Sequence, residues 1–325
     1  MKEYEIGKND AGQRLDRFVS KAAPLLPASL TQKYIRIKRI KVNGKGSPRD
    51  YKLSVGDSVQ MYVNDEFFDT PDEHNAYLKI NNPSLNITYE DKNIILLNKP
   101  AGIICHSDGS ADHNTLIAHV QAYLYQNKNW QPHEENSFAP ALCNRIDRNT
   151  AGIVIAAKNS ESLRIINEKI KLREIDKFYL AAVHGKPKPA SAILEDFIFK
   201  DAVKNQVYVS KESRPGSKTA ILEYETLAAS GGLSLIKCKL ITGRTHQIRA
   251  QLASIGHPLL GDGKYGSERL NKPYGEKQQA LCSYKLTFDF ETDAGILNYL
   301  DKKSFAVLEI NFVKKYFQTI DMAKL

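Results

Sequence analysis

Short apolar runs of strand length recur along most of this chain and restrict its fold more than any other feature. Only a few segments between them show the three-and-four spacing of an amphipathic helix. Because strands outnumber helices and rarely alternate with them, we predict an α+β fold with a large mixed, mostly antiparallel sheet. The predicted strands are residues 93–100, 153–157, 177–183, 219–228, 233–241, 284–290 and 304–312.

Three helices are predicted in the same region, at residues 114–124, 160–175 and 245–255. In each, apolar residues recur three and four positions apart, as in a helix packed against a sheet. Asn114 is expected to cap the first helix and Thr245 the third, because their side chains can accept hydrogen bonds from free backbone N–H groups. The third helix is expected to bury Ile248, Leu252 and Ile255.

The first 63 residues differ from the rest in pattern and in charge. They carry 13 Lys or Arg and 6 Asp or Glu, which accounts for most of the formal net charge of +9. Two short helices and small strands are predicted, with a tight turn at Asn43-Gly44. A local basic unit favours a nucleic acid partner, and the alternative is a solvated charged face. The residues expected to contact RNA phosphates are Arg14, Arg17, Lys33, Arg36, Lys38 and Arg39.

Residues 64–87 are richer in acids and prolines and lack a clear period, so we predict a linker there. The expected organisation is a domain at 1–63, a linker at 64–87 and a large domain at 88–325. The four cysteines are far apart without a C-x-x-C pair, which argues against a zinc site or a disulfide scaffold. Reduced thiols, no apolar signal-like start and no membrane-length apolar run favour a cytoplasmic protein.

Polar residues interrupt the apolar elements in three places, which are candidates for a reaction centre. Arg145 and Asp147 stand just before the strand at 153–157, and Tyr179 lies inside a second strand. An acid beside arginines next to a core strand is either a structural ion pair or a reacting group. The third place is the segment 241–262, which contributes Arg244, His246 and Arg249.

These segments together resemble one known family. The stretch "NRIDRNTAG" resembles the HRLD-x-x-T-S-G signature of the RluA-type pseudouridine synthases. "LLNKPAGI", "KFYLAAVHG" and "ITGRTHQIRAQLASIGHPLLGD" resemble other segments of that family in the same order. Near the start, "GQRLD", "VNG" and "GDSV" are similar to the ribosomal-S4-like RNA-binding domain.

The resemblance implies an enzyme that isomerises uridine to pseudouridine in structured RNA. It implies that Asp147 is the catalytic aspartate, that Arg249 pairs with it and that Tyr179 stacks on the target uracil. Arg145 would hold open the position of the displaced nucleotide, with Arg244 and His246 also in the substrate site. Neither a metal nor an organic cofactor is required. Ribosomal RNA of the large subunit is the expected substrate, transfer RNA is the alternative, and a monomer is expected.

The chemistry of the residues agrees with this reading. A carboxylate can attack the anomeric carbon of the sugar or remove a neighbouring sugar proton, and the sequence does not choose between these routes. A carboxylate ionised in a closed site needs a guanidinium partner, because burying a lone charge is unfavourable. A flipped base can regain about 1–3 kcal/mol by stacking on an aromatic ring. The Tyr179 hydroxyl could also accept the carbon-bound proton, although a phenol is a weak base.

Other readings remain open on the sequence alone. The chain departs from the family pattern at Asn144, Ala151 and Gln251, all beside the matching catalytic positions. A non-catalytic RNA-binding protein is one alternative class. A glycoside hydrolase, which usually needs two carboxylates, is another. Lys99 is expected either to touch phosphate or to be exposed, and His184, His246 and His257 read by residue type as packing or capping residues.

Overall fold

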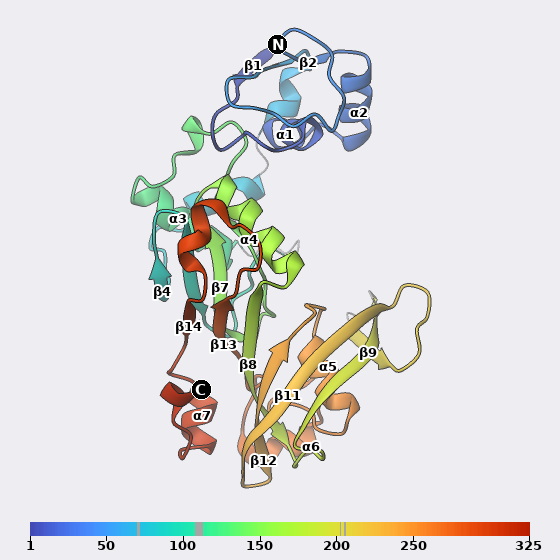
Figure 1. Ribbon diagram of the computed structural model, residues 1–325, viewed down its shortest axis with the longest axis vertical. Helices are drawn as coiled ribbons and strands as arrows, with labels where there is room; N and C mark the ends of the chain where they lie inside the picture. Colours follow the sequence, from blue (N-terminus) through green and yellow to red (C-terminus); the bar gives the residue numbers. More distant parts are fainter. Residues whose placement is uncertain (70–71, 108–112, 202, 205) are drawn as a thin grey trace.

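The chain forms two sheets, seen in a computed structural model that describes residues 1–69, 72–107, 113–201, 203–204 and 206–325. An amino-terminal module holds a small three-stranded sheet at one end of the molecule, and an eleven-stranded sheet runs through the rest (Figure 1). Nearly all described strand pairs are antiparallel, the exception being β7 with β13. The α+β class with a large, mostly antiparallel sheet is therefore confirmed.

The amino-terminal module has a hydrophobic core of its own. Its strands pair in the order β1-β3-β2, and residues from both helices, Phe18 and Ile35 among them, close over the sheet. Asn43 and Gly44 both have positive φ, as required by the tight turn that joins the end of β2 to Lys45. The elements are β1 (Lys2–Glu5), α1 (Leu15–Ala22), α2 (Ala28–Arg36), β2 (Ile40–Val42) and β3 (Ser58–Met61).

The large sheet has the strand order β10-β9-β11-β12-β8-β13-β7-β5-β4, with β14 paired to β13 and β6 to β7. The bounds are β4 (Ile87–Glu90), β5 (Ile94–Lys99), β6 (Ala141–Leu142), β7 (Ala151–Ala157), β8 (Ile175–His184), β9 (Ser191–Asp201), β10 (Gln206–Ser210), β11 (Lys218–Ser230), β12 (Leu233–Leu240), β13 (Leu281–Phe288) and β14 (Ser304–Ala306).

Helices cover both faces of this sheet. They are α3 (Leu116–Gln126), α4 (Ser160–Leu172), α5 (Gln247–Ser254), α6 (Glu268–Asn271) and α7 (Asn311–Tyr316). Short 3-10 helices lie at Asp65–Phe68, Asp72–Lys79, Pro132–Glu134, Lys272–Tyr274, Gly295–Leu300 and Met322–Lys324.

Alternation along the strands divides the core between the two faces. On β5, Ile95 and Leu97 belong to the core cluster that includes residues of α3 and α5, whereas Ile94 and Leu96 belong to the cluster that includes residues of α4 and α7. The two central strands β7 and β13 approach closely at Gly152, where a Cβ would collide with the carbonyl of Ser283. Only glycine fits at this close approach, which places the loop before β7 next to the start of β13.

Several local predictions from the sequence are wrong. The predicted strand 304–312 ends at Ala306, and residues from Asn311 onward form α7. Asn114 and Thr245 are not caps, because Thr115 caps α3 through its hydroxyl and His246 precedes α5. Ile255 lies after the end of α5 and is 36% exposed instead of buried. Strands β9 and β10 were not predicted.

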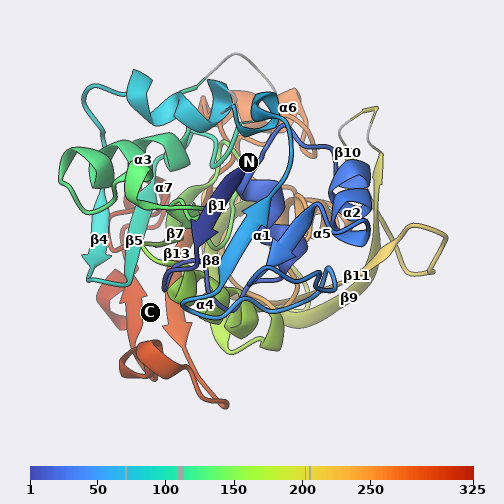
Figure 2. The same ribbon diagram turned by 90° about the horizontal axis from the view of Figure 1, so that it is seen from above.

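The amino-terminal module contacts the rest of the chain through polar groups. The Asp10 carboxylate accepts hydrogen bonds from Asn136 (2.8 Å) and Ser137 (2.6 Å), and Arg164 of α4 donates to the carbonyl of Ala11. The view from above has the module in front of α4 (Figure 2). Within the segment predicted as a linker, Tyr77 is buried in the core of the large sheet.

Candidate active site

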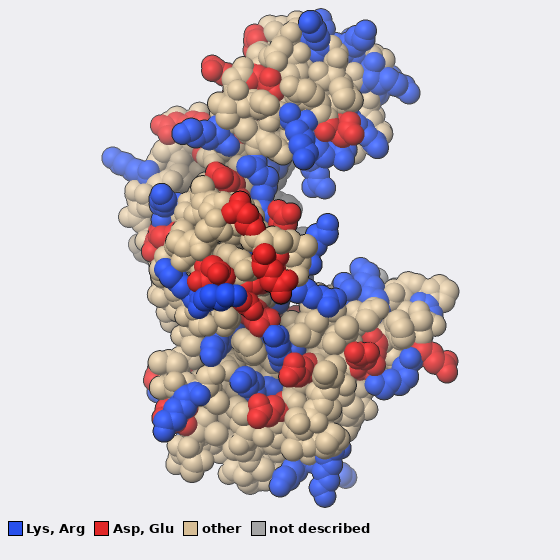
Figure 3. Space-filling model, viewed as in Figure 1, with Lys and Arg blue, Asp and Glu red and all other residues tan. Residues whose placement is uncertain are grey.

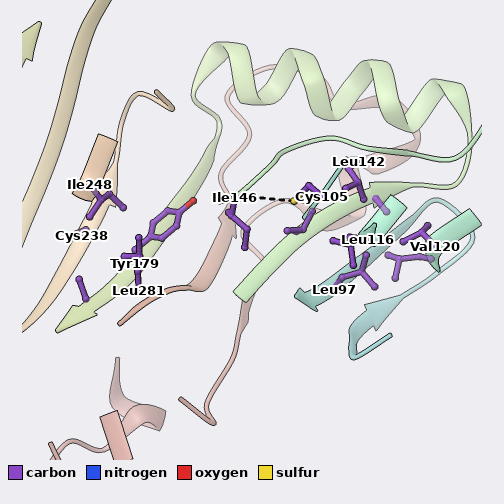
Figure 4. Close-up of a cluster of buried hydrophobic side chains, with 14 of the residues drawn as sticks. Leu97, Cys105, Leu116, Val120, Leu142, Ile146, Tyr179, Cys238, Ile248 and Leu281 are labelled. Atoms are coloured by element: carbon purple, nitrogen blue, oxygen red, sulfur yellow. Dashed lines mark hydrogen bonds between the residues drawn. The ribbon is translucent and has the colours of Figure 1, made fainter. Parts of the chain in front are cut away.

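Hydrogen bonds to backbone carbonyl groups hold the loop that carries Asp147. Cys105 Sγ lies 3.5 Å from the Ile146 carbonyl, and the Gly102 N–H donates to the Arg148 carbonyl at 2.8 Å (Figure 4). The Thr150 N–H closes a turn back onto the Asp147 carbonyl at 3.1 Å. These contacts leave the Asp147 side chain 27% exposed and facing a cavity.

The prediction that Lys99 is exposed or contacts phosphate is wrong. Its side chain is fully buried, and Nζ donates to the carbonyls of Pro100 (2.9 Å), Ile103 (2.7 Å) and Arg148 (2.9 Å). Burial lowers the Lys99 pKa to about 8. This ammonium group therefore joins the end of β5 to the loop of Asp147.

Arg249 extends from α5 toward that loop and contacts two carboxylates. Its Nη1 lies 3.1 Å from Asp147 Oδ2, while Nε and Nη2 hold both oxygens of Asp262 at 2.7 and 3.0 Å. The pKa of Asp262 lies below its ordinary value, since the hydrogen bonds and charge of Arg249 outweigh the effect of burial. Asp262 is thus the stronger partner of Arg249.

Asp262 and Tyr265 were missed in the sequence. Asp262 is 1% exposed and also accepts the N–H groups of Lys264 and Tyr265, at 2.8 and 3.1 Å. The Tyr265 ring lies under the Arg249 guanidinium, 5.2 Å from centroid to carbon. Asp262 could have been found from its place at the end of "GHPLLGD", because a buried arginine on the preceding helix requires a carboxylate nearby.

Tyr179 projects from β8 into the same cavity. Figure 4 shows Tyr179 beside Leu281 and Ile248, with its hydroxyl directed toward Ile146. The residue is 5% exposed, and burial raises the pKa of its hydroxyl well above the ordinary value. A phenol that releases its proton so reluctantly is a poor base at neutral pH, whereas its ring face remains apolar surface for the cavity.

The cavity has a volume of about 190 Å³. A cavity of about 150 Å³ is known to hold benzene, so this one has room for a single pyrimidine ring. Arg145 and Arg244 are exposed side chains at its rim, and Arg244 Nε donates to the Thr219 carbonyl at 3.0 Å. The structure thus brings together all six residues predicted for the catalytic and substrate site: Arg145, Asp147, Tyr179, Arg244, His246 and Arg249.

Two departures from the family pattern have structural partners. Asn144 Oδ1 accepts the Ile155 N–H at 2.8 Å, which fixes the chain entering the Asp147 loop. Gln251 is fully buried and donates to Asp196 Oδ2 at 2.6 Å, on the side of α5 that faces β9 and β11. Neither side chain belongs to the lining of the cavity.

The predicted RNA-contacting residues divide into two groups. Lys33, Arg36 and Lys38 are exposed along a groove of about 540 Å³ in the amino-terminal module, together with Arg49, which was not predicted. Figure 3 shows a hollow between this module and the arm formed by β9, β10 and β11, with basic side chains on both walls. Of the others, Arg17 and Arg39 are exposed, whereas Arg14 pairs with Asp16 at 2.7 Å.

Two kinds of site are absent from the described part of the chain. No group of three or more His, Cys, Asp or Glu there could hold a metal ion. No helix within the described ranges is long and apolar enough to cross a membrane.

Comparison with known proteins identifies the family. The sequence model described as RNA pseudouridylate synthase matches residues 93–254, which include Asp147, Tyr179 and Arg249. An uncharacterized RNA pseudouridine synthase from Mycoplasma genitalium is 32% identical over 88% of this chain and 88% of its own length. The ribosomal large subunit pseudouridine synthase D of Borreliella burgdorferi is 30% identical over 89% of this chain and 85% of its own.

A solved structure gives the same fold. Human RNA pseudouridylate synthase domain containing 4 superposes with a TM-score of 0.54 at 20% identity, over 72% of this chain and 92% of that one. The resemblance in sequence extends well beyond the matched segment, since the bacterial relatives align over most of both chains. The chain therefore belongs to the RNA pseudouridylate synthase family.

Proposed function

We propose that this enzyme converts uridine to pseudouridine in large-subunit ribosomal RNA, with Asp147 as the reacting carboxylate. The observation that carries the proposal is Asp147 itself, a partly exposed carboxylate paired with Arg249 at 3.1 Å in a cavity sized for one base. A purely structural ion pair would not need an open cavity in front of the acid. Asp262, the other carboxylate nearby, is fully buried and bound by Arg249.

The isomerisation requires three events at one place. The C1′–N1 bond breaks, the base turns, and a new bond joins C1′ to C5. Asp147 either bonds to C1′ or removes a neighbouring sugar proton during the first event, and both routes require the ionised carboxylate that Arg249 stabilises. Tyr179 offers its ring face to the uracil, which must leave its stack at a cost of a few kcal/mol.

Among the described residues that line the cavity, Asp147 is the one acid, which argues against glycosidic hydrolysis. Both hydrolytic geometries need a second carboxyl group at about 5–9.5 Å that can act on water or the leaving group. Asp262 lies on the far side of Arg249, with both oxygens occupied by the guanidinium and one of them also by backbone N–H groups. We therefore favour isomerisation over hydrolysis.

The choice of ribosomal RNA rests on two observations. Two relatives, at 32% and 30% identity, are named ribosomal large subunit pseudouridine synthases C and D. The basic groove lined by Lys33, Arg36, Lys38 and Arg49 suits the phosphates of a folded RNA, in the manner of an S4-like RNA-binding domain.

The test is release of tritium from RNA labelled at carbon 5 of uracil. Wild type should release tritium from unmodified large-subunit ribosomal RNA, and Asp147→Asn should release none while binding RNA within a few-fold. Turnover by Asp147→Asn would remove Asp147 from the mechanism. Release from transfer RNA alone would move the substrate to that class. Binding without release from either RNA would favour a non-catalytic RNA-binding protein.

A further inference from the structure

His246 occupies an unusual backbone position at the entrance to α5. Its φ of 52° and ψ of 20° lie in the left-handed region, which is unfavourable for a residue other than glycine. This conformation directs the imidazole into the cavity, where its side chain is 12% exposed and Nε2 lies 3.9 Å from Asp147 Oδ2. Conformations of this kind persist where surrounding contacts hold them, often at functional sites.

The contacts of Tyr265 favour one of the two neutral tautomers of His246. The Val207 N–H donates to the Tyr265 hydroxyl oxygen at 2.9 Å, and the same oxygen lies 2.9 Å from His246 Nδ1. Because the Tyr265 oxygen accepts a hydrogen bond from Val207, the Tyr265 hydroxyl proton is free to be donated. Among the described residues, His246 Nδ1 is the one acceptor within reach of this proton. We infer that Nδ1 accepts the hydroxyl proton, which leaves the proton of the neutral ring on Nε2, the nitrogen nearer Asp147.

The surroundings also keep the ring neutral. Burial lowers the pKa of His246, and the charges of Arg249 and Lys264 act in the same direction. Asp147 and Asp262 oppose them, but the net effect is a pKa below the ordinary value. At neutral pH the ring is uncharged and does not compete with Arg249 for the negative charge of Asp147.

We propose that His246 is a catalytic hydrogen-bond donor, whose Nε2–H binds a carbonyl oxygen of the uracil, and that Tyr265 is the positioning residue that fixes this tautomer. The proposal rests on the proposed function and deepens it. When the C1′–N1 bond breaks, its electron pair passes to the base and spreads over the ring nitrogens and carbonyl oxygens. A donor aimed at one of these oxygens stabilises that charge.

His246 itself keeps its proton throughout. The electron pair on the base forms the new C5–C1′ bond, and the proton on C5 then leaves to solvent. A neutral imidazole suits this task, because it donates without transferring its proton. This assignment also gives the reaction a donor that Tyr179, with its hydroxyl directed toward Ile146, does not supply.

The tautomer can be tested without substrate. Nitrogen-15 NMR of histidine-labelled protein at pH 7 should show His246 with a protonated Nε2 and an unprotonated Nδ1, the signal being assigned by its loss in His246→Gln. Tyr265→Phe removes the donor to Nδ1 and should shift His246 toward a mixture of tautomers. A wild-type ring protonated on Nδ1 would overturn the proposal.

Kinetics on labelled ribosomal RNA then test the role. His246→Leu should lower kcat about 100-fold, the usual loss for one donor at a developing negative charge, with KM changed little. His246→Gln places an amide N–H near the position of Nε2 and should recover to within about tenfold of wild type. Tyr265→Phe should fall between them. A merely structural role would not separate Leu from Gln while KM and RNA binding stay constant.

The outcomes distinguish this proposal from the function it rests on. An active wild type with an equally active His246→Leu would overturn the donor role alone. A wild type that turns over neither ribosomal nor transfer RNA would overturn both, even with the expected tautomer. Loss of activity in His246→Leu and His246→Gln alike, with folding intact, would also count against a donor, since the amide should replace it.

Discussion

The buried pair of Arg249 and Asp262 allows a quantitative prediction for Asp262→Asn. The substitution keeps the volume but removes the charge, and it turns an amide N–H₂ toward groups that donate. Arg249 Nε and Nη2 lose their ionic partner at 2.7 and 3.0 Å, and the remaining contact is Nη1 with Asp147 at 3.1 Å. Removing one partner of a buried pair costs about 3–5 kcal/mol. Because Asp147 remains, we expect a value near the lower limit, about 3 kcal/mol.

Thermal unfolding followed by circular dichroism measures this loss. At roughly 2–4 °C per kcal/mol for a large domain, Tm should fall by roughly 6–12 °C at pH 7. The matched control is Asp289→Asn, which removes an exposed partner of Lys302 and should leave Tm nearly unchanged. A shift in Asp262→Asn no larger than in this control would refute the reasoning that Asp262 neutralises a buried guanidinium.

The same pair fixes the sign of a pH effect. The pKa of Asp262 is lowered in the folded protein, because Arg249 outweighs burial. Its contribution to stability is therefore fully present above the unfolded pKa of about 3.9 and is lost as the pH falls through the folded value. The Tm difference between wild type and Asp262→Asn should be constant from neutral pH to mildly acidic pH. It should shrink only under strongly acidic conditions.

Three further predictions follow from other parts of the structure. Lys99→Met should destabilise the protein by several kcal/mol, because three buried carbonyls lose their donor. The Lys99 pKa is about 8 in the folded protein, so between pH 8 and 10 the unfolded chain binds more protons than the folded one. The free energy of unfolding of wild type, measured in urea, should therefore increase relative to that of Lys99→Met over this range. A constant difference between the two free energies would contradict this. The double variant Arg36→Glu with Lys38→Glu should weaken RNA binding and reduce the slope of its salt dependence. Arg14→Ala should reduce that slope less, because Arg14 is already paired with Asp16. Equal slopes in the two variants would show that the groove does not bind RNA phosphates. Under the proposed function the ring of Tyr179, and not its hydroxyl, stacks on the base, so Tyr179→Phe should keep kcat within about tenfold and Tyr179→Leu should lose more. The reverse order in single-turnover assays would make the hydroxyl essential.

The sequence predicted those features that depend on residues close together in the chain. The apolar runs are local, and they were sufficient for the fold class and for most strands of the large sheet. Alternation failed at residues 304–312, where Leu308 is exposed and Val307 and Ile310 pack against the core from a loop. The buried side chains in that segment face the sheet without belonging to it, and a period of two cannot distinguish these cases.

Polar contacts between residues far apart in the chain could not be predicted from local sequence patterns. Lys99 precedes a proline and reads as a surface residue, yet its ammonium group is satisfied by carbonyls of two loops that meet only in the folded chain. Tyr265 acts through Val207 and His246, which lie on separate elements. Such residues carry no local pattern, because the requirement they meet, satisfying buried polar groups, arises only after the sheet has formed.

The arrangement around Arg249 explains why the site needs two carboxylates of unequal exposure. Asp262, with a side chain 0% exposed, neutralises the buried guanidinium and fixes its plane by a two-point contact. Asp147, at 27% exposed, meets the same group through one nitrogen and one oxygen, Oδ2. Its Oδ1 has no hydrogen-bond partner among the described residues, and Asp147 lines the cavity. Under the proposed function, Asp262 keeps Arg249 in place whether or not Asp147 is reacting, so Asp147 can form or break a bond through Oδ1 without releasing a buried charge.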